Sequence, residues 1–194
     1  MKHPSTRLVF DYWEQKRGQR LAPERSDIEP GPIRAALGDT FILGRDPRGG
    51  HHFRLAGTRL CALFCRELKG APFIELWAAS ERDSMLRQVA AVSEESTGFV
   101  AGVTGRNMDR ATIDLELLLL PLAHRDRNQA RLLGVLAPLV APYWLGANSV
   151  RDLTCGSVRH LSRDTLHVRA PRLVPISGNG RLRRGLVVYD GGRS

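Results

Sequence analysis

Apolar residues recur along the chain with two spacings, and each spacing predicts one kind of element. Alternating apolar and polar residues are typical of a strand with one buried face, whereas apolar residues three and four apart are typical of a helix. The first spacing predicts five strands, at residues 40–45, 51–56, 99–104, 111–122 and 132–140. The second predicts helices at residues 6–18, 32–38, 58–70 and 80–96. A turn rich in Gly, Asp and Pro joins the first two strands into an antiparallel hairpin.

Residues 51–70, HHFRLAGTRLCALFCRELKG, are the centre of this pattern. Phe53 and Leu55 alternate with other residues as in a half-buried strand, which Gly57 interrupts. Thr58 is then placed to cap a helix, since its hydroxyl can accept a hydrogen bond from an unpaired amide. One face of this helix is apolar before Gly70 ends it; that face carries Leu60, Cys61, Phe64 and Leu68. The segment predicts a strand with a short helix lying across it.

The N-terminal helix and the longest strand each have an apolar patch that needs cover. The helix has a stripe of four apolar side chains: Leu8, Val9, Tyr12 and Trp13. In the strand, four residues from Ile113 to Leu119 share one face, which leaves Leu118 and Leu120 on the other. Burying a Leu or a Trp is worth roughly 1.5–3 kcal/mol, so exposing both patches would be costly. The helix is therefore predicted to cover the sheet's outer face, within one chain or across a homodimer.

The order of the elements, two strands, a run of short helices and three more strands, resembles that of a PAS domain. The resemblance covers about residues 40–142, and its form is closest to short bacterial regulatory proteins with a single PAS domain. It implies an α+β fold, in which a five-stranded antiparallel sheet is flanked by short helices and preceded by the amphipathic helix. The implied parts are an N-terminal helical extension (1–38), the PAS-like domain (39–142) and a basic, partly disordered C-terminal extension (143–194).

The composition and the terminal sequence indicate where the protein is located. Of the 194 residues, 42% are hydrophobic and 25% are charged, as in ordinary globular proteins. The N-terminus lacks the pattern of a secretory signal, and the most apolar run, residues 132–145, is too short to span a bilayer. Three cysteines are typical of a protein with reduced thiols. We therefore expect a cytoplasmic protein without a membrane span.

The positive charge of the C-terminal extension suggests a second kind of partner. The net charge is +9, and residues 151–194 contribute +6 of it, so the C-terminal extension could contact nucleic acid. However, 26 of the 29 basic residues are arginine throughout the chain, which favours coding bias over selection for phosphate contacts. A solvated tail is the preferred interpretation, and a nucleic-acid-associated regulator is the alternative.

The sequence shows no established pattern for catalysis or for a cofactor. No nucleophile elbow, paired carboxylates or phosphate loop is evident, so we expect no enzyme activity. His51, His52, Cys61 and Cys65 could be drawn as a metal site, but no Cys-x-x-Cys pair is present and ordinary thiols explain the cysteines better. By the resemblance, a flavin site would need an Asn-Cys-Arg-Phe type stretch and a haem site a histidine within residues 80–104. Both features are missing, so flavin and haem are disfavoured.

A pocket between the sheet and the helices is the remaining candidate site. Seven residues are predicted to surround it: Phe41, Phe53, Cys61, Phe64, Trp77, Leu115 and Leu117. An aromatic and aliphatic lining suits a small ligand. The alternative is that these side chains fill the core completely. Arg59, beside the helix start, is either a polar anchor for the ligand or a surface residue.

These observations predict a non-catalytic sensory or regulatory module of bacterial signal transduction. It would act by binding a small-molecule ligand or a protein partner, and binding would shift how the N-terminal helix docks on the sheet.

Overall fold

The computed structural model describes residues 1–46, 49–123, 131–161, 181–183 and 186–188. The chain divides into two compact units, Met1–Ser162 and Arg163–Ser194. Each unit is described by itself.

A six-stranded antiparallel sheet forms the centre of the first unit, in the order β2-β1-β5-β4-β3-β6. The strands are β1 (Thr40–Arg45), β2 (His51–Ala56), β3 (Gly98–Asn107), β4 (Thr112–Leu122), β5 (Arg131–Pro138) and β6 (Val150–Leu161). The predicted α+β fold with an antiparallel sheet and flanking helices is confirmed, and the five predicted strands are β1 to β5.

The sixth strand, β6, was not predicted, and the sheet therefore has six strands rather than five. β6 pairs with β3 from Gly98↔Leu161 to Asn107↔Val150, inside the range that the sequence assigned to a C-terminal extension. Only Val150, Leu153 and Leu161 are buried in it. An edge strand that exposes most of both faces has no apolar alternation, and so it leaves no periodic signal in the sequence.

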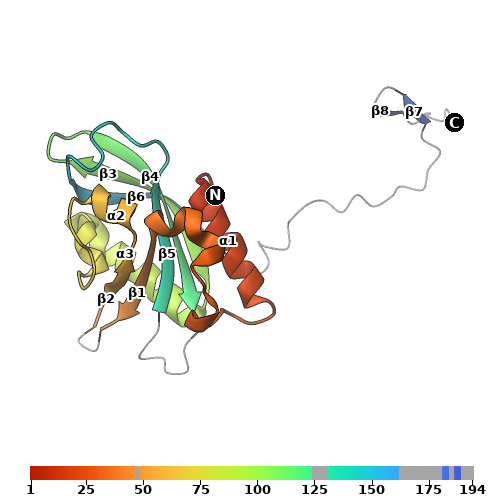
Figure 1. Cartoon of the computed structure of the whole chain (residues 1–194), viewed down its shortest axis with the longest axis horizontal. Coiled ribbons are helices and arrows are strands. Elements are labelled where there is room, and N and C mark those ends of the chain that lie inside the picture. Colours follow the sequence, from red (N-terminus) through yellow and green to blue (C-terminus); the bar gives the residue numbers. More distant parts are fainter. Residues whose placement is uncertain (47–48, 124–130, 162–180, 184–185, 189–194) are drawn as a thin grey trace. The chain divides into compact units, whose positions relative to one another are not determined.

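One face of the sheet, which we call the inner face, is covered by the segment between β2 and β3 (Figure 1). This segment contains α2 (Thr58–Leu63), η3 (Phe73–Leu76), η4 (Ala79–Glu81) and α3 (Arg82–Glu95). The helix α2 is shorter than predicted: Phe64 is its C-cap, and Cys65 has φ +49°, outside the helical region. Gly57, not Thr58, occupies the N-cap position. The predicted side chains Met85, Val89 and Val92 of α3 face the core.

The same segment also covers parts of both sheet edges. At the β2 edge, the Phe53 amide donates to the Ala71 carbonyl at 3.0 Å and the Gly70 amide donates to the Phe53 carbonyl at 2.7 Å. At the β6 edge, the Ala78 amide donates to the Leu153 carbonyl at 3.0 Å. Exposed strand edges invite pairing with other chains, so these bonds shield two positions where such pairing could start.

The opposite, outer face of the sheet is covered by the N-terminal part of the chain (Figure 1). This part contains α1 (Pro4–Arg17), η1 (Arg25–Asp27) and η2 (Gly31–Asp39). Pro4 occupies the first turn of α1, where a missing amide proton costs nothing, and Gly18 ends the helix with φ +55°. The predicted N-terminal helix is thus confirmed, and it lies against β4 and β5 of its own chain.

The second unit contains a two-stranded antiparallel hairpin, β7 (Arg181–Arg183) with β8 (Leu186–Val188). Most of the predicted basic, partly disordered extension beyond β6 lies outside the described residues.

Candidate functional site

Four aromatic side chains form a continuous cluster on the inner face. Phe41 of β1 lies 5.4 Å from Phe53 of β2 and 5.8 Å from Phe73 of η3, measured between ring centroids. Phe73 in turn lies 5.9 Å from Trp77, edge to face. The Phe41 ring covers Gly134 of β5, where a Cβ atom would meet the ring at 2.1 Å. These spacings are those of well-packed aromatic pairs, so the cluster fixes the helical segment to the sheet.

The structure brings the predicted pocket residues together around this cluster. Six of them, Phe41, Phe53, Phe64, Trp77, Leu115 and Leu117, lie in one buried group, and half-buried Cys61 packs at its margin. Phe73, which joins three of the aromatic rings, is absent from the predicted set. Its position next to Pro72 in an irregular segment gave no periodicity by which it could be assigned to a face. Ligand binding by this group stays a prediction.

Trp77 has an unusual polar atom within this apolar group. The residue is 0% exposed, and its indole Nε1 has no hydrogen-bond partner among the described residues. Its backbone is fixed instead, because Arg82 Nε donates to the Trp77 carbonyl at 3.1 Å and Trp77 bridges to Leu153 of β6. A buried donor without an acceptor costs about 1–3 kcal/mol. The inner cluster thus contains a buried indole donor without a partner among the described residues.

His51 lies where β2 meets α3. Its Nε2 is 3.2 Å from the Ser93 hydroxyl, which also donates to the Val89 carbonyl at 3.1 Å. Burial lowers the pKa of His51 from 6.5 to about 4, with smaller contributions from the positive charges of Arg45 and His52. The imidazole is therefore neutral at neutral pH.

On the outer face, the apolar stripe of α1 packs within its own chain. Val9, Tyr12 and Trp13 are buried, and Leu8 is half-buried. Leu118 and Leu120 are each 0% exposed, as expected for a covered patch. Phe10, which the sequence reasoning missed, is also buried and stacks with Trp13 at 6.4 Å. The stripe needs no second chain for its burial, and the homodimer stays a prediction.

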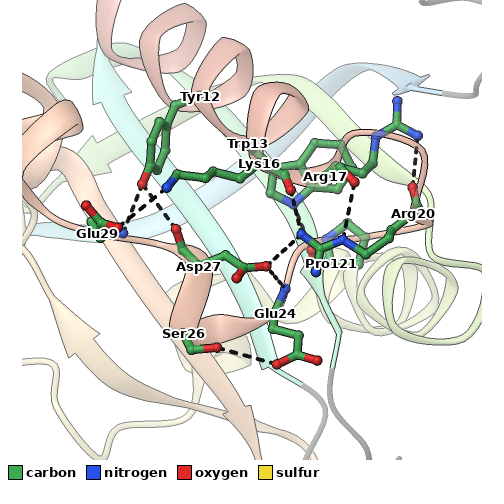
Figure 2. Close-up of polar contacts among 10 residues, drawn as sticks. All are labelled: Tyr12, Trp13, Lys16, Arg17, Arg20, Glu24, Ser26, Asp27, Glu29 and Pro121. Carbon is green, nitrogen blue, oxygen red and sulfur yellow. Dashed lines mark hydrogen bonds and ion pairs between the residues drawn. The ribbon is translucent and has the colours of Figure 1, made fainter.

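Polar contacts fix the C-terminal half of α1 (Figure 2). Trp13 Nε1 donates to the Pro121 carbonyl of β4 at 2.8 Å. The Tyr12 hydroxyl donates to the Asp27 carbonyl at 3.2 Å and accepts from the Glu29 amide at 3.0 Å. The polar atoms of both buried aromatic side chains in this half of the helix are thus hydrogen-bonded.

Two buried carboxylates fix the N-terminal end of α1. Glu116 of β4, 6% exposed, accepts from the Lys2 amide at 2.7 Å and from the His3 amide at 2.8 Å. Asp39, 2% exposed, accepts from the Ser5 hydroxyl at 2.6 Å and from two nitrogens of Arg59 at 2.7 Å each. A carboxylate near a helix N-terminus is favourable because the unpaired amides there carry partial positive charge.

Arg59 lies at the surface, which is one of the two predicted alternatives, and it also has a buried partner. Its side chain is 52% exposed, but its guanidinium forms the bidentate pair with Asp39 and donates to the Ala35 carbonyl at 3.0 Å. Hydrogen bonding to Asp39 raises the pKa of Arg59 above its ordinary value, against a smaller effect of burial. Arg59 therefore joins α2 to the end of η2.

A family model described as a PAS domain matches residues 1–137. This is well over half of the chain. The chain belongs to the PAS domain family. PAS domains are sensory and signalling modules and are generally non-catalytic. The match begins at the first residue and so includes α1, which the sequence placed in an extension before the domain.

Three solved structures are similar to this PAS domain at low identity. A PAS domain from Colwellia psychrerythraea has 15% identity and a TM-score of 0.39, over 54% of this chain and 92% of that one. A light-oxygen-voltage domain studied with a flavin analogue has 17% identity and a TM-score of 0.42, over 59% and 86%. A PAS domain of an HTR-like protein from Haloarcula marismortui has 19% identity and a TM-score of 0.36, over 53% and 86%. No curated protein matches the chain. The assignment rests on the family match.

The residues considered as metal ligands have separate contacts in this PAS domain. Cys65 is exposed, Cys61 Sγ lies 3.9 Å from a Glu67 carboxylate oxygen, and His51 contacts Ser93. Within the described ranges, no three side chains of His, Cys, Asp or Glu gather as metal ligands would. Each helix in the described part of the chain is too short or too polar to cross a bilayer.

Proposed function

We propose that this PAS domain is a sensory and regulatory module of bacterial signal transduction that binds a small ligand on its inner face. The observation that supports this most is the indole N–H of Trp77, which is fully buried and has no acceptor among the described residues. An oxygen or nitrogen acceptor on a ligand would remove the cost of burying this donor. The aromatic rings of Phe41, Phe53 and Phe73 would supply the apolar walls.

The chemistry of the inner face indicates the class of ligand. Among the described residues, the buried charged side chains are Asp39 and Glu116, and both accept hydrogen bonds from the first five residues of the chain on the outer face. Burying a charge without a partner is very costly. We infer a compact, uncharged and largely apolar molecule with one hydrogen-bond acceptor. The phosphate of a flavin nucleotide or the carboxylates of a haem would find no buried positively charged side chain among the described residues.

Native mass spectrometry of the full-length protein, purified without denaturation, tests the proposal and reports the stoichiometry in the same spectrum. The expected result is one small molecule per chain, which is lost when the protein is denatured. A dimer mass would support the predicted homodimer. Since the stripe of α1 is already buried in its own chain, such a dimer would have to use another surface. If the side chains fill the core completely, the spectrum should show only the mass of the chain without a ligand.

A matched pair of probes tests the role of Trp77. Acetophenone and ethylbenzene have similar size and shape, but only acetophenone has a carbonyl acceptor. Trp77→Phe keeps an aromatic ring and removes the donor. We expect acetophenone to bind about five- to tenfold more weakly to the variant, since a hydrogen bond contributes about 1 kcal/mol, and ethylbenzene to bind equally to both proteins. Failure of both probes to bind the wild-type protein, together with a bare chain mass, would contradict the proposed function.

A further inference from the structure

Asp39 is placed between the two layers of the PAS domain. It is the last residue of η2, directly before β1 begins at Thr40. One of its carboxylate oxygens accepts from Ser5 of α1, on the outer face, and both oxygens accept from Arg59 of α2, on the inner face. One buried carboxylate thus contacts the first turn of the outer helix and the first turn of an inner helix.

Next to this carboxylate, the backbone at the start of α2 packs directly against the backbone of η2. A Cβ atom on Gly57, the N-cap of α2, would lie 2.1 Å from the Leu37 carbonyl oxygen and 2.4 Å from that of Gly38. A Cβ atom on Gly38 would lie 2.8 Å from the guanidinium carbon of Arg59. The Gly57 amide also donates to the Thr40 carbonyl at 2.9 Å. Because backbone meets backbone here, a displacement of α2 must move η2 or stretch the Arg59–Asp39 pair.

The helix α2 is in turn part of the candidate ligand site. Leu60 and Leu63 of α2, with Phe64 at its C-cap, belong to the buried inner cluster, and Cys61 packs at its margin. A change in what the inner face contains would therefore act on this helix. Its N-terminal turn carries the guanidinium that holds Asp39.

We propose that the Ser5–Asp39–Arg59 bridge couples the inner face to the docking of α1. Displacement of α2 by a ligand draws Arg59 away from Asp39, the carboxylate loses two charge-assisted hydrogen bonds, and its bond to Ser5 no longer has one fixed geometry. The first turn of α1 then opens more often. The inference rests on the proposed function, because it describes how occupation of that site would reach the outer surface.

Residue-resolved hydrogen exchange on the full-length protein tests the coupling without any ligand. Arg59→Ala removes the link, and we expect the amides of the first two turns of α1 to exchange about tenfold faster, relative to the amides of β4. Arg66→Ala is the matched control, because Arg66 is an exposed arginine three residues after α2 ends. It should leave the exchange of α1 unchanged. Equal exchange in the two variants would overturn the proposal.

A second substitution tests whether a disturbance of α2 reaches α1 through the bridge, or whether Arg59 only stabilises its own surroundings. Phe64→Leu disturbs α2 from the inner side and should speed the exchange of α1 at least threefold in the wild-type background. In the Arg59→Ala background the same change should add nothing. If Phe64→Leu has no effect in either background, or an equal effect in both, the bridge does not transmit. Leu60→Val replaces Phe64→Leu if that variant does not fold. Since no ligand is present, these results stand independently of whether the inner face binds one.

Discussion

The inner and outer faces of this sheet are both buried, but their contacts differ in kind. The inner face is held mainly by aromatic and aliphatic side chains, with one polar contact between His51 and Ser93, and the buried atoms Trp77 Nε1 and Gln88 Oε1 have no partner among the described residues. The outer face combines apolar packing with buried polar groups, of which Ser5, Asp39 and Glu116 are hydrogen-bonded, although Thr6 Oγ1 has no described partner. Apolar packing tolerates a change of contents better than directional bonds do.

The outer contacts also fix one position of α1 along β4. The helix start contacts Glu116 through the amides of Lys2 and His3, and Trp13 contacts the Pro121 carbonyl. The ten residues from His3 to Trp13 rise about 15 Å as a helix, and the five from Glu116 to Pro121 span about 17 Å as a strand. The polar contacts at the two ends therefore match only in one register. On the inner side, the covering segment is hydrogen-bonded at the β2 and β6 edges, and its packing on the face itself is mainly apolar. This is the difference expected between a binding layer and a layer that reports on it.

The largest expected effects come from truncating neighbouring leucines on opposite faces of β4. Leu117 and Leu118 are each 0% exposed, so Leu117→Ala and Leu118→Ala should each cost about 2–5 kcal/mol in the free energy of unfolding. Only Leu118→Ala should also speed hydrogen exchange in α1 relative to β4, because Leu118 lies on the face that α1 covers. Denaturant unfolding measures the first effect and hydrogen exchange the second. Equal loss of protection in α1 from both changes would mean that the faces are not separate.

Acid should weaken the inner layer through His51. The pKa of His51 is about 4 in the folded chain and near 6.5 when unfolded, so between these pH values the unfolded chain binds more protons. Its contribution to stability is complete above pH 6.5 and is lost as the pH falls to about 4. The free energy of unfolding should drop by about 3 kcal/mol across this window in the wild-type protein. In His51→Gln this part of the drop should be missing, and an unchanged profile in that variant would refute the assignment.

A smaller effect is expected from the carboxylate at the start of α1. Glu116→Gln leaves one acceptor for the two amides of Lys2 and His3 and should cost about 1–3 kcal/mol. Asp114→Asn is the control, because Asp114 is an exposed carboxylate two residues earlier on the same face; its cost should stay within about 0.5 kcal/mol. Thermal unfolding compares the two variants. Equal costs would show that the outer face depends on packing alone.

Hydrophobic periodicity predicted most of the fold, because β1 to β5, α1 and α3 all bury apolar side chains. It could not predict β6, which exposes most residues from Arg151 to His160. Nor could it predict the polar contacts, since these join residues far apart in the sequence. Glu116 and the amide of Lys2 are separated by 114 positions, and Ser5 and Asp39 by 34. The pocket residues were predictable as a buried apolar set, but the unpaired donor of Trp77 emerges only when the partners of every buried atom are known.

Two of the three tryptophans, Trp13 and Trp77, lie on opposite faces and allow the most direct test of the central claim, that the inner face receives a ligand through Trp77. The indole N–H of Trp13 already donates to the Pro121 carbonyl, whereas that of Trp77 has no acceptor among the described residues. A titration of the full-length, ¹⁵N-labelled protein with acetophenone would follow the indole signals of Trp13 and Trp77 by NMR, with Trp13→Phe and Trp77→Phe used to assign these two among the three tryptophans. The account predicts that the Trp77 signal moves downfield as its donor gains an acceptor, while the Trp13 signal stays in place. A Trp77 signal that does not move, or an equal movement of both signals, would contradict it.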